Sequence, residues 1–181
     1  MQDEESLVRR AKQHDQTALT QIYEENFDRI YRYIVLKIGE RTEAEDMTQQ
    51  VFLNAFKSIS SFEYKKGTPF SSWLFRIAHN RVVDYLRKKS RQATVYLDES
   101  LAYNTSGDNN PGLTVERNLD VNRLVVATRR LTKAQQEVIF LRFAGELPVA
   151  HVAKIMGKSE GAVKALQHSA IVSLRKILTA G

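Results

Sequence analysis

The sequence contains no cysteine, only 3 prolines and 8 glycines among 181 residues, and no apolar run near the roughly 18–20 residues of a membrane span. The lack of cysteine excludes disulfides and thiolate metal sites and fits a reducing compartment. Its four histidines lie far apart without ligand-like spacing, so we expect no metal site. The acidic N-terminus lacks the apolar region of a signal peptide. We therefore expect a cytoplasmic protein without membrane insertion.

Helical periodicity dominates the chain, and 43% hydrophobic residues are enough to build a core. These features predict an all-α fold with two small helical domains joined by a flexible linker. In the first domain we expect four helices: 3–13, 17–38, one starting with a Thr42/Glu45 capping box, and 68–91. Gly39 should end the second of them.

The strongest helical pattern is TPFSSWLFRIAHNRVVDYLRKKSR, at 68–91. Thr68 suits the N-cap, and Pro69 suits the first helical position because it has no N–H to leave unpaired. Arg81 falls inside the apolar arc, where its alkyl stem can be buried. The opposite face carries Arg76, Asn80, Val83 and Arg87. This face is either an ordinary solvated surface or a row of amide and guanidinium groups that lies along nucleic acid.

A loop, SSFEYKKGT at 60–68, precedes this helix. It carries two aromatic and two basic side chains: Phe62, Tyr64, Lys65 and Lys66. Such residues can stack on unpaired bases and hold phosphate. Aromatic residues in loops also often anchor the fold, and the pattern leaves both interpretations open.

Charge is segregated along the chain, whose net charge is +6. Residues 1–94 carry 16 basic and 13 acidic side chains, residues 95–120 carry 1 and 5, and residues 121–181 carry 10 and 3. Two basic segments thus flank an acidic one, which favours a polyanionic partner for each basic segment. Ser, Asn, Asp, Gly and Pro cluster before position 113 without helical period, which predicts a flexible linker over 93–113.

The last third of the sequence predicts a helix-turn-helix. Helical spacing returns over 114–131, and a capping box follows at Thr132 and Gln135. Pro148 opens a short helix that ends at Gly157, and Ser159 can cap the final helix.

Three positions have offsets typical of that motif: a small residue at Ala153, a turn glycine at Gly157 and an apolar residue at Val163. An incidental pair of helices is the alternative. Lys164, Gln167 and His168 of the final helix are placed to reach a major groove.

Four motifs occur in a fixed order: TEAEDMTQQVFLNAF, PFSSWLFRIAHNRVVDYLRKKSR, LTKAQQEVIFLRF and GKSEGAVKALQHSAIVSLRKIL. Together they resemble a bacterial RNA polymerase sigma factor of the extracytoplasmic-function (ECF) type, over nearly the whole chain except the linker. The resemblance implies region 2 at 1–92, a linker at 93–113 and region 4 at 114–181. It implies a specificity subunit without catalytic residues or cofactors, which directs core RNA polymerase to promoters.

The resemblance also implies roles for individual residues. The helix that carries Asp46, Gln49, Gln50, Leu53 and Phe56 would bind the clamp coiled coil of the polymerase's largest subunit. The −10 element would be opened and read by Phe62, Tyr64, Lys65, Lys66, Arg76, Asn80, Asp84, Arg87 and Lys88. The −35 element would be read as duplex by Ser159, Glu160, Lys164, Ala165, Gln167, His168 and Ser169. An anti-sigma factor or other regulator is a further expected partner.

Two departures from the family pattern stand out. Gln50 replaces a frequent Glu in the clamp motif, and Ser169 and Ile171 replace frequent Arg residues, so fewer DNA contacts are expected from that helix. The alternative function is a free-standing helix-turn-helix regulator, which would not need the block at 42–91. We find no H-E-x-x-H motif, phosphate-cradling Gly loop or Ser/His/Asp set, so an enzyme is not expected.

Overall fold

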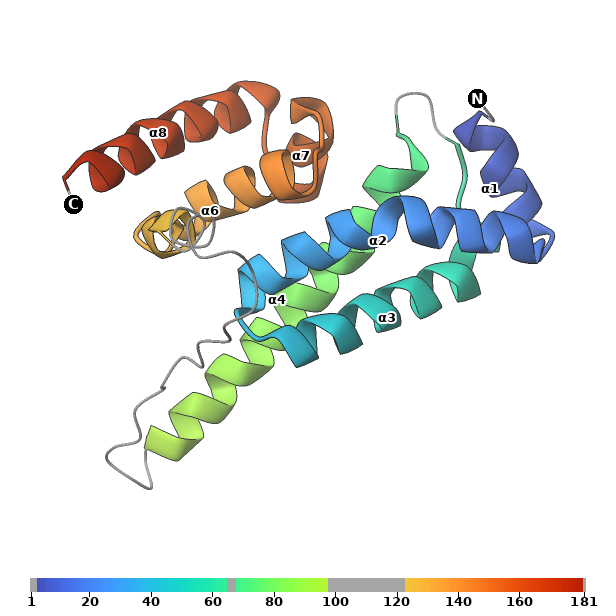
Figure 1. Ribbon diagram of the computed structural model, residues 1–181, viewed down its shortest axis with the longest axis horizontal. Coiled ribbons are helices and arrows are strands. Elements are labelled where there is room, and N and C mark those ends of the chain that lie inside the picture. Colours follow the sequence, from blue (N-terminus) through green and yellow to red (C-terminus); the bar gives the residue numbers. More distant parts are fainter. Residues whose placement is uncertain (1–2, 65–67, 98–122, 181) are drawn as a thin grey trace.

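The structure is a computed structural model that describes residues 3–64, 68–97 and 123–180 (Figure 1). Within these ranges the regular structure is helical throughout, without a β-strand, which confirms the predicted all-α class. Lys65, Lys66, the linker beyond residue 97 and the predicted helical stretch at 114–122 lie outside the described residues.

The first domain is a bundle of amphipathic helices. Its elements are α1 (Glu4–Lys12), α2 (Gln16–Ile38), α3 (Arg41–Ser58), the short 3₁₀ turn η1 (Ile59–Ser61) and α4 (Phe70–Leu97). Helix α2 packs on both α3 and α4. The ring centroids of Tyr23 and Phe27 on α2 lie 4.8 and 6.4 Å from that of Phe52 on α3. These aromatic contacts bury the apolar faces that the periodicity predicts.

Helix α3 begins at Arg41, and its N-cap, Glu40, lies two residues before the predicted N-cap, Thr42. The carboxylate of Glu40 accepts hydrogen bonds from the N–H groups of Thr42 and Glu43 at 3.0 and 2.7 Å. The predicted capping box with Thr42 as N-cap is therefore wrong. A carboxylate that meets two unpaired N–H groups at the positive end of the helix dipole competes well against a single hydroxyl.

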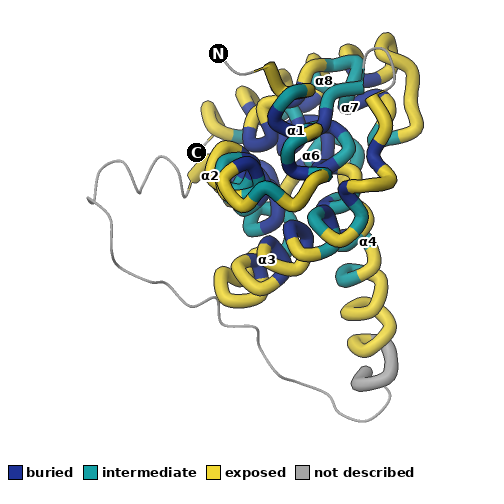
Figure 2. Tube along the Cα trace, turned by 90° about the vertical axis from the view of Figure 1, so that its right-hand side faces the viewer, coloured by how far each residue is buried: buried dark blue, intermediate teal, exposed yellow. Residues whose placement is uncertain are grey.

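Helix α4 is displaced from its predicted bounds at both ends. It begins at Phe70, because Pro69 provides the capping carbonyl, while the Thr68 hydroxyl accepts a hydrogen bond from Lys154 Nζ at 3.0 Å. It continues to Leu97 instead of Arg91, since QATVYL contains neither Gly nor Pro to stop it. The later part of α4 projects beyond the bundle and is largely exposed (Figure 2).

The buried arc of α4 also holds Arg81. With the Asn54 amide oriented so that its oxygen faces α4, that oxygen accepts from the Arg81 guanidinium at 3.0 and 3.2 Å. The basic side chain therefore bridges to α3, which explains its place inside the apolar arc.

The second domain consists of a helical stretch at 123–128, α6 (Lys133–Ile139), the π-helical turn η2 (Phe140–Ala144), α7 (Val149–Met156) and α8 (Glu160–Thr179). The predicted capping box is present: the Thr132 hydroxyl accepts from the backbone N–H of Gln135, and the Gln135 side chain accepts from the backbone N–H of Thr132. Fully buried side chains of this domain come from α6, η2, α7, α8 and the turn after η2: Val138, Leu141, Leu147, Val152, Val163 and Ala170.

Helices α7 and α8 form the predicted helix-turn-helix. Gly157 ends α7 in the left-handed conformation, with φ of 63°, and its N–H bonds the carbonyl of Ala153. The Ser159 hydroxyl accepts from the N–H of Ala162 at 3.1 Å and caps α8. Val163 is fully buried. The turn glycine, cap and packing residue thus fix the angle between the two helices.

The loop before α4 closes over an aromatic cluster. The ring centroid of Phe62 lies 5.3 Å from those of both Phe70 and Trp73, and the Phe62 side chain is 3% exposed. Burial of this ring ties the end of η1 to the start of α4.

We predict that Phe62→Ala lowers the free energy of unfolding of the first domain by about 3–5 kcal/mol, as expected for truncation of a buried aromatic residue. Tyr64→Ala serves as the control, because Tyr64 is 38% exposed, and should cost much less. Urea unfolding followed by the single tryptophan, Trp73, measures both. Equal losses for the two variants would contradict the anchoring role of Phe62.

Candidate functional site

One exposed face of α3 combines acidic, amide and apolar side chains. Asp46, Gln49, Gln50 and Leu53 recur at helical spacing on it and are exposed, and Leu53 reaches 57%. Phe56 is half-buried and packs against Phe52, with ring centroids 6.0 Å apart. The structure therefore brings the first four residues together on one surface that the bundle core does not use, with Phe56 at its edge.

A second exposed face lies on α4. Arg76, Asn80, Asp84 and Arg87 recur along it, and Lys88 adjoins it. Asp84 and Arg87 form an ion pair of 3.7 Å that is well exposed to solvent and so weak. The face is basic overall and carries the amide of Asn80. Basic and amide side chains are groups that contact phosphate and sugar along a nucleic-acid strand.

The loop aromatics differ in what they can do. Phe62 is buried in the aromatic cluster, so its proposed stacking on an unpaired base is corrected: the ring serves as an anchor. Tyr64 packs on Phe62 with ring centroids 5.0 Å apart and keeps an exposed edge. Burial, together with Glu4, raises the pKa of Tyr64, so its phenol is neutral. Of these two rings, Tyr64 can meet a base without disrupting the cluster.

The third exposed surface is the first half of α8. Exposed side chains there are Ser159, Glu160, Lys164, Ala165, His168 and Ser169, while Gln167 is half-buried. Gln167 Oε1 accepts from Arg142 Nε at 2.9 Å, and Ser169 Oγ accepts from Gln135 Nε2 at 2.8 Å. These two residues are held by their own domain, which leaves Lys164 and His168, one turn apart, as the longer exposed side chains.

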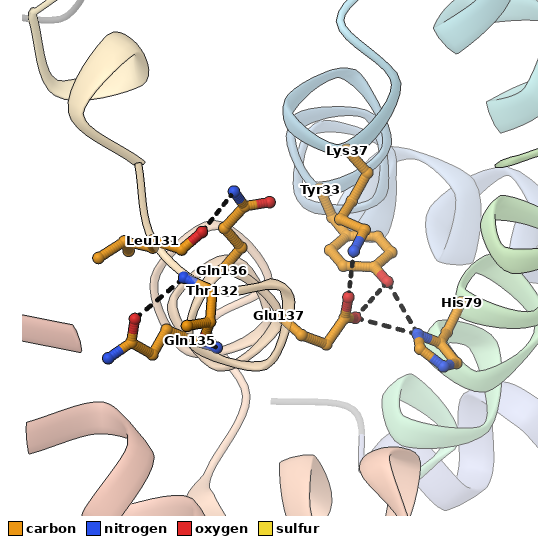
Figure 3. Close-up of polar contacts among 8 residues, drawn as sticks. All are labelled: Tyr33, Lys37, His79, Leu131, Thr132, Gln135, Gln136 and Glu137. Atoms are coloured by element: carbon orange, nitrogen blue, oxygen red, sulfur yellow. Dashed lines mark hydrogen bonds and ion pairs between the residues drawn. The ribbon is translucent and has the colours of Figure 1, made fainter. Parts of the chain in front are cut away.

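The two domains meet through a buried carboxylate, that of Glu137 on α6 (Figure 3). Its Oε1 accepts from the hydroxyl of Tyr33 at 2.6 Å and lies 3.0 Å from Nδ1 of His79. Its Oε2 pairs with the ammonium of Lys37. Glu137 is 7% exposed, and its three partners come from α2 and α4 of the other domain.

A second contact lies at the turn after η2. The carbonyl of Gly145 accepts from Nε and Nη2 of Arg29 at 3.0 and 2.7 Å, and Arg32 Nη2 pairs with Glu146 Oε1 at 3.0 Å. A Cβ at Gly145 would lie 2.8 Å from the Phe75 ring. The turn therefore lies so close to Phe75 of α4 that a side chain at position 145 would collide with its ring.

Burial alone raises the pKa of Glu137, but its hydrogen bond with His79, the charge of Lys37 and the Tyr33 hydroxyl outweigh burial and lower the pKa to about 2. Burial in turn raises the pKa of Tyr33, so its hydroxyl stays a donor. The contact is thus an ionised carboxylate satisfied by three donors from the other domain.

Comparison with known proteins decides between the alternatives. Residues 22–92 match the model of Sigma-70 region 2, and residues 129–176 match that of Sigma-70 region 4. The chain is 31% identical over 181 residues to the ECF RNA polymerase sigma factor SigW of Bacillus subtilis, covering 94% of each chain. This chain belongs to the ECF family of RNA polymerase sigma factors. It therefore directs core RNA polymerase to promoters, and the free-standing regulator is not favoured.

Further relatives agree with this assignment. The sigma factor is 38% identical over 172 residues to ECF sigma factor BldN of Streptomyces coelicolor, covering 95% of this chain and 64% of that relative's length. A solved structure of CnrH with the cytosolic domain of CnrY has the same fold, with a TM-score of 0.71 at 22% identity and 96% of each chain covered.

Among the residues that the structure describes, no group of His, Asp and Glu could hold a metal ion. Among the described helices, none has the length and apolarity to cross a membrane.

The sequence did not identify the residues that join the two domains of the sigma factor. Tyr33 and Lys37 lie outside the four motifs, and nothing in the two motifs that contain His79 and Glu137 indicates that these residues meet. One signal was available: Glu137 is a single acidic residue next to the apolar run VIFL. A charged residue in such a run is buried only with partners.

We predict an acid-dependent loss of the contact at Glu137. A carboxyl pKa lowered from 4.5 to about 2 corresponds to roughly 3 kcal/mol. Because the pKa is depressed, this contribution is complete above about pH 4.5 and is lost as the pH falls toward 2. The variant Glu137→Gln should lack this contribution to stability at every pH.

Urea unfolding of the wild type and Glu137→Gln between pH 3 and 7 measures this difference, with the exposed Glu25→Gln of α2 as control. The stability gap between the wild type and Glu137→Gln should narrow in acid. A gap that stays constant across this range would contradict the assigned ion pair.

Proposed function

We propose that the two domains divide promoter recognition, with region 2 over residues 1–92, a linker over 93–113 and region 4 over 114–181. The observation that carries this proposal is that both matched domains expose a face with basic and amide or imidazole side chains, on α4 and on α8. Such faces supply the phosphate contacts that dominate DNA affinity. The protein would act in the cytoplasm by binding alone, without a catalytic residue or cofactor of its own.

The face of α3 would bind the clamp coiled coil of the polymerase's largest subunit. Asp46 supplies charge, Gln49 and Gln50 supply hydrogen bonds, and exposed Leu53 supplies apolar area beside Phe56. A mixed surface with an apolar centre and polar surroundings is typical of a specific protein interface.

The loop and the α4 face would act on the −10 element. Tyr64 offers an exposed aromatic edge in the loop, and Arg76, Asn80, Asp84, Arg87 and Lys88 form a second exposed face along α4. An aromatic ring and a row of cations suit an unpaired strand, because the ring stacks on a base while the cations hold phosphates. Lys65 and Lys66 are proposed for the same role.

The first half of α8 would read the −35 element in the major groove. Lys164 and His168 would reach base edges, Ala165 would contact a thymine methyl, and Ser159 and Glu160 stand where the helix begins. Gln167 and Ser169, held by Arg142 and Gln135, would support this surface through their own domain.

A regulator that restrains the sigma factor is a further proposed partner. The RpoE sigma factor of Bartonella quintana was solved with the anti-sigma factor NepR, and its fold matches this chain with a TM-score of 0.71 at 21% identity, covering 88% of this chain and 96% of that one. We propose that an anti-sigma factor binds this protein as well.

Run-off transcription tests the function as a whole. The purified chain, added to core polymerase on genomic fragments, should produce transcripts with defined start sites that share −10 and −35 sequences. The control reaction with core alone should lack them. Identical start sites in both reactions would reject the proposal.

We predict that Asp46→Asn weakens binding to core polymerase about tenfold, since it removes one charge from the α3 face, and leaves the unfolding midpoint unchanged. The neighbouring Glu45→Gln, also exposed, is the matched control for the loss of one negative charge. Fluorescence titration with core measures both. Equal effects of the two variants would show that the general charge of α3, and not this position, matters.

We predict that Lys164→Ala changes the preferred −35 sequence. A good base contact is worth roughly 1–3 kcal/mol of discrimination, so the preference at one position should change by about tenfold or more. Lys176→Ala, exposed near the end of the same helix, should weaken binding without altering the preferred sequence. Selection from a promoter library with core polymerase gives both answers. The same −35 motif for Lys164→Ala and the wild type would reject the assigned face.

A further inference from the structure

Helix α1 lies against both described ends of the loop that precedes α4 (Figure 1). At one end of α1, the ammonium of Lys12 donates a hydrogen bond to the backbone carbonyl of Phe62. At the other end, Glu4 Oε1 accepts a hydrogen bond from the N–H of Ser71 at 3.3 Å. The residues matched to Sigma-70 region 2 begin at 22, so α1 lies before the part that the family model describes.

The contact at Glu4 joins the start of α4 to the loop. The first N–H groups of a helix have no partner within the helix, and a carboxylate is favoured there by the helix dipole. Glu4 meets this need for Ser71, which lies in the first turn of α4. Burial raises the pKa of Tyr64, and a hydrogen bond from the Tyr64 phenol to the Glu4 carboxylate raises it further. One side chain of α1 therefore contacts both α4 and the exposed aromatic residue of the loop.

The contact at Lys12 holds the residue on which Tyr64 packs. The Lys12 side chain is half-buried, and its ammonium binds the Phe62 carbonyl. The Phe62 ring is buried in the aromatic cluster, and its centroid lies 5.0 Å from that of Tyr64. Phe62 is thus fixed through its backbone by α1 and through its ring by the cluster, which leaves Tyr64 a rigid surface to pack on.

A cleft of about 310 Å³ separates α1 from the exposed side of the loop. Its lining residues come from both segments: Glu5, Val8, Arg9, Lys12, Glu63 and Tyr64. Helix α1 therefore forms one wall of the space beside the Tyr64 ring. A displacement of α1 would change both the position of this ring and the space next to it.

We propose that Glu4 and Lys12 of α1 are positioning residues for opening of the −10 element, because they hold Tyr64 in the orientation in which its ring stacks on an unpaired base. A ring that is fixed before DNA arrives loses less conformational freedom when it stacks, so more of the stacking free energy favours the open strand. Neither positioning residue needs to contact DNA itself. This inference rests on the proposed function of Tyr64 at the −10 element.

The position of Tyr64 can be measured without DNA. Fluorotyrosine incorporated at all seven tyrosines gives fluorine NMR signals, and the signal of Tyr64 is identified by its loss in Tyr64→Phe. Glu4→Ala and Lys12→Met remove the contacts at opposite ends of α1, and each should shift or broaden this signal. Lys12→Arg keeps a donor at position 12 and should leave the signal close to that of the wild type. Glu24→Ala, an exposed residue of α2, is the matched control for the loss of one carboxylate.

The effect on opening is measured with core polymerase on a promoter found by run-off transcription. Each of the two variants should open the duplex −10 element about tenfold more slowly than the wild type, as expected for loss of one hydrogen bond to a charged group. Permanganate reactivity of unpaired thymines follows this rate. Affinity for core should be unchanged, and a template with a pre-melted −10 element should restore most of the transcription. Adding Glu4→Ala to Tyr64→Ala should slow opening no further, because both changes act through the same ring.

An unchanged Tyr64 signal in both variants, an undiminished rate of opening, or additive losses in the double variant would overturn the positioning role. If one variant fails to fold by circular dichroism, the other decides, since Lys12 and Glu4 make separate contacts. An altered Tyr64 signal in both variants, together with a wild type that opens no promoter with core, would support the contacts of α1 with the loop and reject the proposed function.

Discussion

The structure depends on one buried carboxylate, Glu137, which joins two helical domains whose buried apolar residues form one cluster. Its three donors all come from the opposite domain, so the carboxylate is satisfied only while the domains touch. A buried carboxylate without partners would cost much free energy, whereas a carboxylate exposed to water would not. The contact therefore favours either a closed chain or a fully separated one, and disfavours arrangements in which Glu137 stays buried without partners.

The exposed faces follow from the same division. Since the apolar residues of α3, α4 and α8 turn into the buried apolar cluster, their other faces are left to polar and basic side chains such as Asp46, Arg76 and Lys164. Such faces suit a sigma factor that directs core RNA polymerase to promoters.

Much of the helical fold was predictable from sequence, because the signals that decide where helices begin and end are local. Helical periodicity, the left-handed Gly157 and the capping box at Thr132 depend on residues a few positions apart, and the structure confirms them. The errors arose where a distant or neighbouring group competed: Glu40 replaced Thr42 as a cap, and Lys154 engaged Thr68.

The aromatic and interdomain contacts show the limit of sequence patterns. Phe62 and Tyr64 stand two positions apart in one loop, yet only packing against Phe70 and Trp73 decides which ring is buried. Glu137 meets residues 58 to 104 positions away, and no period or motif links them. Contacts of that kind are set by how two complete domains fit together.

The account as a whole rests on the claim that core polymerase turns this chain into a promoter-specific binder. The most direct measurement is a fluorescence anisotropy titration of promoter duplex with the chain, with and without core, at physiological salt. The account predicts weak, strongly salt-dependent and non-specific binding by the chain alone, and tight promoter-specific binding once core is present. Tight, sequence-specific binding by the chain alone would contradict it.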